Sequence, residues 1–96
     1  MGAPFELTAR ETRAVRVAVT VARSAGVVGV SDVIAVPVQG RFVVDTQALA
    51  PICRSLTHVA REIPPQETRA RLGIARPELD ALFARVVARW AYVAGL

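Results

Sequence analysis

The order of apolar and polar residues along the chain changes from a helical period to a strand-like one and back again. The segment Thr8-Ala9-Arg10-Glu11 matches a capping box and predicts that a helix starts at Thr8. The polar positions after it share one narrow stripe of a helical wheel, which is typical of a solvated helix face: Arg13, Arg16, Thr20 and Arg23.

Residues 13–23 also fit a strand. Valines occupy every second position from Val15 to Val21, which is the period of a half-buried strand built from residues that favour strands. The capping box, the alanine content and the stop signal at Gly26 favour the helix, but the pattern leaves the strand open as an alternative.

The middle of the chain is rich in β-branched residues and glycine. Two apolar runs, 33–38 and 41–44, are separated by Gln39-Gly40, which predicts a β-hairpin over about 33–44 with a positive φ at Gly40. Pro37 has no amide hydrogen and belongs on an outward-facing edge of that hairpin. A further short strand is expected in Val27–Val30.

Three helices are expected in the second half, over about 51–62, 66–72 and 77–94. Pro51 and Pro77 suit first turns, and Ile63-Pro64-Pro65 ends the first of these helices. In 51–62 the apolar stripe makes Cys53 a small buried residue and places His58 at the surface or its boundary. In the last helix the apolar positions recur at i, i+3, i+4 and i+7, with Phe83 and Trp90 expected as core anchors: Leu79, Leu82, Phe83, Val86, Val87, Trp90 and Val93.

These elements predict one α+β domain over residues 1–96, mainly helical. It has an N-terminal helix, one hairpin and three helices in a helix-turn-helix-like arrangement. A second domain is excluded because the chain has only 96 residues, and 53% hydrophobic content excludes disorder. The longest apolar stretch is broken by Asp32 and Pro37, and charged residues interrupt the N-terminus, so we expect a cytoplasmic protein with no membrane span.

Few residues of the chain are candidates for catalysis or metal binding. One cysteine, Cys53, and one histidine, His58, are too few for a zinc site, and five residues apart on one helix their side chains diverge. No phosphate loop or catalytic triad motif is present. We therefore predict a protein that is not an enzyme and needs no metal or cofactor.

The net charge of the chain indicates which partners it could bind. All 12 basic residues are arginines, and against 8 carboxylates they give a net charge of +4. Such a surplus suits nucleic acid, an anionic membrane or an acidic protein.

The segment from Glu67 to Leu82 looks like a helix-turn-helix, with Leu72-Gly73-Ile74 ending the first helix and Leu79 and Leu82 locking the second against it. Together with the preceding strand and helix, residues 40–90 resemble winged-helix domains, including those in the C-terminal arm of the selenocysteine-specific elongation factor, which bind an RNA hairpin. The resemblance implies nucleic-acid binding. The start of the second helix departs from this, because Glu78 and Asp80 would repel phosphates.

Two functions follow. The first is a small, dimeric helix-turn-helix-like regulator that grips nucleic-acid phosphates with eight arginines: Arg13, Arg16, Arg23, Arg69, Arg71, Arg76, Arg85 and Arg89. The alternative is a homo-oligomeric structural or adaptor subunit that binds itself or another protein through its Ala/Val-rich helices and the hairpin edge. In either case the last helix is the expected oligomer interface, through Ala81, Ala84, Ala88, Trp90 and Ala91.

Overall fold

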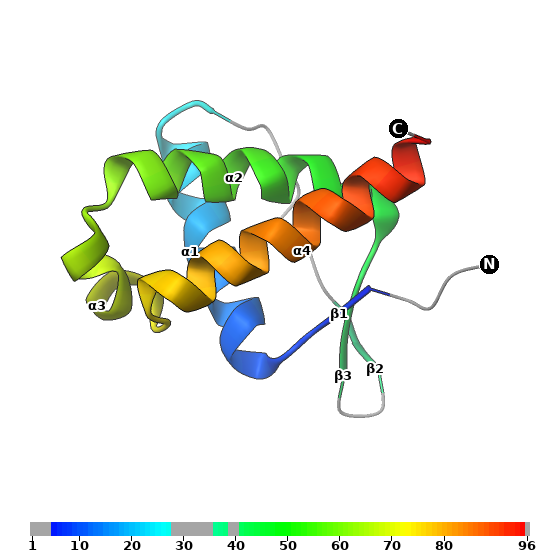
Figure 1. Cartoon of the computed structure of the whole chain (residues 1–96), viewed down its shortest axis with the longest axis horizontal. Helices are drawn as coiled ribbons and strands as arrows, with labels where there is room; N and C mark the ends of the chain where they lie inside the picture. The colour runs from blue at the N-terminus through cyan, green and yellow to red at the C-terminus, as the bar shows by residue number, and fades with distance from the viewer. Residues whose placement is uncertain (1–4, 28–35, 39–40, 96) are drawn as a thin grey trace.

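A computed structural model of the chain describes residues 5–27, 36–38 and 41–95. Four helices pack around one core, with a small sheet at one end (Figure 1). The elements follow in the order β1 (Phe5–Leu7), α1 (Ala9–Ser24), β2 (Val36–Val38), β3 (Arg41–Val44), α2 (Leu49–Glu62), α3 (Thr68–Leu72) and α4 (Arg76–Ala94). Short 3-10 turns at Thr46–Ala48 and Pro65–Glu67 lead into α2 and α3. The expected class, a mainly helical α+β fold with an N-terminal helix, a hairpin and then helices, is confirmed.

Residues 13–23 form a helix and not a strand. Both hydrogen bonds of the predicted capping box are present: Glu11 N donates to Thr8 Oγ1 at 3.1 Å, and Thr8 N donates to a Glu11 carboxylate oxygen at 2.9 Å. The buried positions lie opposite the arginine stripe: Thr12, Ala14, Val15, Ala18, Val19 and Ala22.

In the described residues the sheet has three strands, in the order β1-β3-β2, and β1 is not one that the sequence predicted. The missed strand, β1, pairs antiparallel with β3, with Phe5 opposite Val44. Its three residues are too few to show a period, and their pairing depends on a strand 35 or more residues away. β2 is an edge strand, which confirms the edge position expected for Pro37. The predicted turn at Gln39-Gly40, residues 33–35 and most of the candidate strand 27–30 lie outside the described residues.

A sharp turn at Gly73 joins α3 to α4, where the sequence predicts the end of a helix. α3 ends at Gly73, whose φ of 82° is left-handed, and α4 starts three residues later. Only glycine adopts this conformation without strain, so the sharp reversal depends on it. Leu72, Ile74 and Leu79 are buried on either side of the turn and hold the two helices together.

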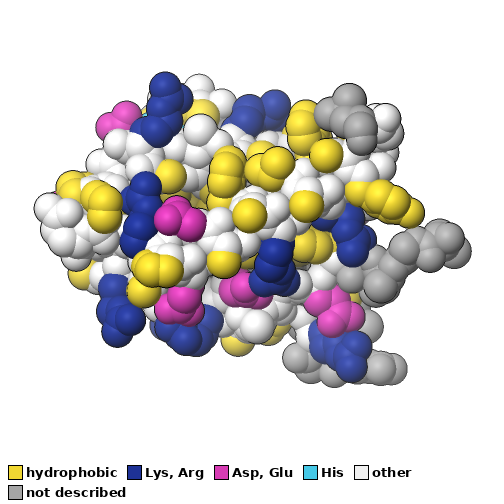
Figure 2. Space-filling model, in the orientation of Figure 1, with side chains coloured by type: hydrophobic (Ala, Val, Ile, Leu, Met, Phe, Trp, Pro, Cys, Tyr) yellow, Lys and Arg dark blue, Asp and Glu magenta, His cyan; other side chains and the backbone are white. Residues whose placement is uncertain are grey.

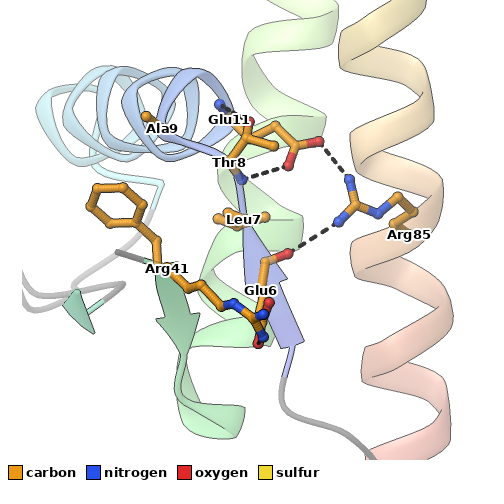
Figure 3. A pocket seen from close by; sticks show the side chains of 8 residues that line it. Glu6, Leu7, Thr8, Ala9, Glu11, Arg41 and Arg85 are labelled. Carbon is orange, nitrogen blue, oxygen red and sulfur yellow. Dashed lines mark hydrogen bonds and ion pairs between the residues drawn. The ribbon is translucent and has the colours of Figure 1, made fainter. Parts of the chain in front are cut away.

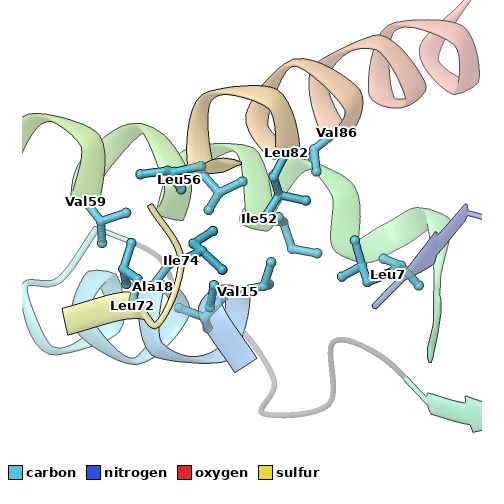
Figure 4. Packing of buried hydrophobic residues seen from close by; sticks show 14 of the residues in the cluster. Leu7, Val15, Ala18, Ile52, Leu56, Val59, Leu72, Ile74, Leu82 and Val86 are labelled. Carbon is cyan, nitrogen blue, oxygen red and sulfur yellow. The ribbon is translucent and has the colours of Figure 1, made fainter. Parts of the chain in front are cut away.

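The core lies between α1, α2, α3 and the first half of α4, and buried residues of β1 and β3 extend it toward the sheet (Figure 4). Leu79, Leu82 and Val86 of α4 are buried, but Trp90 is 37% exposed and therefore is not the core anchor expected. Val87 and Val93 are exposed as well. The apolar stripe continues past the buried core, so its last residues are only partly covered.

On α2, Cys53 is half-buried where the sequence predicts a buried residue, and the polar Ser55 is fully buried. Burial of Ser55 is tolerated because its hydroxyl donates to Pro51 O at 2.8 Å.

Candidate nucleic-acid interface

Three of the eight predicted phosphate-binding arginines lie on α4, and the side chains of all three contact other elements of the protein. Arg76 closes the C-terminal end of α2: its guanidinium donates to Ala60 O at 2.8 Å and to Ile63 O at 3.3 Å. It also pairs with Asp80 at 3.4 Å. These carbonyls belong to the last turn of α2, which has few backbone partners of its own, so Arg76 serves as a side-chain cap between two helices.

Arg85 and Arg89 hold α4 against β1. Arg85 forms an ion pair with Glu11 and donates to Glu6 O at 3.1 Å (Figure 3). Both guanidinium groups lie over the Phe5 ring, at 5.7 Å and 5.5 Å from its centroid. The two guanidinium groups therefore interact with the aromatic face of Phe5, and that of Arg85 also pairs with the Glu11 carboxylate.

The pocket drawn in Figure 3 has a volume of about 400 Å³ and lies at this joint. Its charged residues are two carboxylates and two arginines, and they are already paired: Glu11 with Arg85, and Glu6 with Arg41 at 3.4 Å. The pocket offers no excess charge to a ligand, and we interpret it as a structural contact between β1, α1 and α4.

Four of the predicted arginines are exposed, and their guanidinium groups make no hydrogen bond or ion pair with any other described residue. They are Arg13 and Arg16 on α1 and Arg69 and Arg71 on α3, and we call this set the arginine face. Arg23, the eighth, is also exposed and belongs to the same stripe at the end of α1.

Two contacts join α1 to the turn that follows α3. Arg10 Nη2 donates to Gly73 O at 3.5 Å, and the stem of Arg13 lies beside Gly73, with its Cδ 4.0 Å from where a Cβ would be. A shallow pocket of about 310 Å³ lies between them. The turn thus brings Arg10 and Arg13 of α1 to the end of α3, the helix that carries Arg69 and Arg71. Sequence reasoning had not singled out Arg10, because its partner is 63 residues away.

The carboxylates at the start of α4 are paired with arginines. Glu78 accepts a hydrogen bond from Ala75 N at 3.1 Å and pairs with Arg10 at 3.4 Å, while Asp80 pairs with Arg76. The repulsion of phosphates expected from these two carboxylates is therefore reduced, although the pairs also occupy the helix end that would otherwise approach a base.

Two further exposed arginines were not predicted. Arg54 and Arg61 lie two turns apart on α2, and within the described ranges neither has an ion-pair or hydrogen-bond partner. With Val27 and His58 they line a separate pocket of about 310 Å³. Their spacing of seven residues on the polar side of a helix was the signal that could have found them.

The residues expected at an oligomer interface divide between two sides of α4. Ala81, Ala84 and Ala88 are exposed on the outer side, and Ala91 is half-buried. Trp90 continues the core-facing stripe beyond the core.

No catalytic arrangement is evident in the part of the chain that the structure describes. Burial raises the pKa of the Cys53 thiol, and the nearby Arg54 lowers it by less, so the thiol is kept in its unreactive neutral form. Among the described residues no group of three His, Cys, Asp or Glu side chains could hold a metal ion. None of the described helices is both long and apolar enough to cross a bilayer.

Compared with known proteins, the chain matches no family model, no curated protein and no solved structure.

Proposed function

We propose that the protein is a small non-enzymatic nucleic-acid-binding protein that holds phosphates with the arginine face, Arg13, Arg16, Arg69 and Arg71. The observation that carries the proposal is the distribution of charge. Of the seven described carboxylates, four are used in ion pairs with arginines inside the molecule: Glu6, Glu11, Glu78 and Asp80. The positive surplus therefore remains on arginines that point into solvent.

Arginine suits this role because its planar guanidinium forms paired hydrogen bonds with phosphate oxygens and stays charged at every physiological pH. Two helices that meet at a fixed corner can place such groups on successive phosphates. Contacts to phosphates position a protein without reading sequence, so the proposal concerns affinity and not base specificity.

Salt dependence tests the proposal. We expect a labelled 12-base-pair DNA duplex, or an RNA hairpin with the same number of phosphates, to bind with a log–log salt slope of roughly −3 to −4, since each phosphate contact contributes about −0.9 on duplex DNA. The double variant Arg13→Gln/Arg16→Gln should reduce the steepness by about 2 and weaken binding roughly tenfold at low salt. The two probes distinguish DNA from RNA.

The matched control is Arg54→Gln/Arg61→Gln, which removes the same charge from exposed arginines on α2. At about 0.1 M salt, charges more than ~10 Å from a phosphate are largely screened, so this variant should lose less than about twofold. If both double variants weaken binding equally, the protein binds by net charge alone and the arginine face is not the site. A flat salt dependence, or no binding to either probe, would also reject the proposal.

A second candidate function is favoured by a different observation, the exposed apolar residues near the end of α4. Under it the protein is a homo-oligomeric structural or adaptor subunit, and its exposed arginines pair with carboxylates of another protein.

A further inference from the structure

The last two turns of α4 extend beyond the core. Val86 is the last buried residue of the helix, and every described residue after it is exposed or half-buried. In Figure 1 this end of α4 projects past the body of the molecule, beside the start of α2.

Three large apolar side chains on the core-facing side of this extension contact water. Val87 is 37% exposed, Trp90 37% and Val93 47%. Taking roughly 150–250 Å² for a whole large side chain, these fractions leave on the order of 200 Å² of apolar surface uncovered. Half-buried Phe83 and Ala91 adjoin them, and Figure 2 shows hydrophobic side chains gathered around this half of α4 and along its border with α2. We call Phe83, Val87, Trp90, Ala91 and Val93 the Trp90 patch.

The Trp90 patch carries no charge. Between Ala81 and Ala94 the charged residues are Arg85 and Arg89, and β1 holds both on another side of the helix. This matters for the choice of partner because each copy of the chain has a net charge of +4. A two-fold contact brings each surface patch against itself, so a basic patch would repel its own copy whereas an uncharged apolar patch would not.

We infer that the Trp90 patch is the docking surface for a second copy of this chain, with the two α4 helices packed against each other about a two-fold axis and Trp90 near its centre. An acidic partner would be drawn to the exposed arginines instead. The inference rests on the second candidate function, a homo-oligomeric subunit, and names the surface of α4 through which the copies bind. It does not depend on nucleic-acid binding.

The area that the two copies can bury limits how stable the dimer is. A stable interface buries about 800 Å² on each partner, and the Trp90 patch with the neighbouring border of α2 supplies only part of this. A contact smaller than this gives a weak dimer, which should form only at high protein concentration.

Sedimentation velocity without nucleic acid tests the inference, at protein concentrations from about 1 to 300 μM. We expect monomers to convert to dimers across this range. Because Trp90 is the single tryptophan, its emission should shift to shorter wavelength over the same range as the indole leaves water. The variant Val87→Glu should stay monomeric at 300 μM, since each dimer would bury two carboxylates in an apolar contact.

Ala81→Glu is the matched control, because it adds the same charge at an exposed position on the opposite side of α4 and should still dimerise. Helical circular dichroism and the Tm of both variants should match those of the parent, which separates loss of the contact from loss of the fold. A protein that is monomeric at 300 μM, a dimer that persists in Val87→Glu, or open assemblies larger than two would each overturn the inference. Val87→Glu that still binds the 12-base-pair probe leaves the nucleic-acid proposal intact, so the two failures are distinguishable.

Discussion

Two threonines one turn apart show how the same side chain can stabilise or destabilise a helix. Thr8 caps α1, and its hydroxyl accepts the amide hydrogen of Glu11. Thr12 is 3% exposed, and its hydroxyl oxygen has no hydrogen-bond partner among the described residues. A buried hydroxyl that has lost water without gaining a protein partner costs free energy.

We therefore expect Thr→Val to act in opposite directions at these two positions. Thr12→Val keeps the shape and removes the unpaired hydroxyl, and should raise the free energy of unfolding by about 1 kcal/mol. Thr8→Val removes the cap and should lower it by about 1 kcal/mol. Urea unfolding followed by circular dichroism measures both. A loss of stability in Thr12→Val would mean that its hydroxyl has a partner after all.

At the scale of elements, arginine side chains connect helices in addition to the apolar core. Arg76 is only 23% exposed and connects the start of α4 with the last carbonyls of α2. Arg69, seven residues earlier, is exposed and caps nothing outside its own helix. The two residues had identical expected roles at the level of sequence.

This difference predicts a separation of stability from binding. Arg76→Gln should lower the free energy of unfolding by about 1–3 kcal/mol, because it leaves the carbonyls of Ala60 and Ile63 without charged donors, and should change nucleic-acid affinity little. Arg69→Gln should leave the free energy of unfolding within about 0.5 kcal/mol of that of the parent, but should measurably weaken nucleic-acid binding. Urea unfolding and fluorescence anisotropy on the same two proteins decide the matter. Weaker binding by folded Arg76→Gln would return Arg76 to the interface.

The sequence predicted the elements that local chemistry determines. The capping box of α1, the end of α3 at Gly73 and the start of α4 near Pro77 each depend on residues within a few positions of one another. The strand β1 could not be found in this way, because its partner β3 is distant in the chain.

The exposure of Trp90 escaped prediction for a different reason. Periodicity tells which side of a helix faces the core, but not where the core ends. The roles of Arg10 and Arg85 could not be predicted from the sequence either, since their hydrogen-bond partners lie 63 to 79 residues away in the chain.

At the scale of the whole molecule, the arginine face and the Trp90 patch are on different elements. The face belongs to α1 and α3, while the patch is at the far end of α4, away from α3 in Figure 1. A dimer through the patch therefore leaves both arginine faces exposed, and two faces on one nucleic acid bind more tightly than one because the second contact is intramolecular.

The longest dimension of one molecule is 38 Å, close to the ~34 Å of ten base pairs. A 10-base-pair duplex should therefore hold one protein molecule, and a 40-base-pair duplex several. We expect the parent to bind the long duplex cooperatively, with a Hill coefficient above 1, because neighbouring molecules also bind each other through the Trp90 patch. Val87→Glu should bind the short duplex with unchanged affinity, but the long one about tenfold more weakly and with a Hill coefficient near 1. Anisotropy titrations with the two duplexes measure this, and Ala81→Glu should behave as the parent does. Equal cooperativity in Val87→Glu would show that nucleic-acid binding and self-association are independent, since cooperative binding requires the contact between copies that this variant removes.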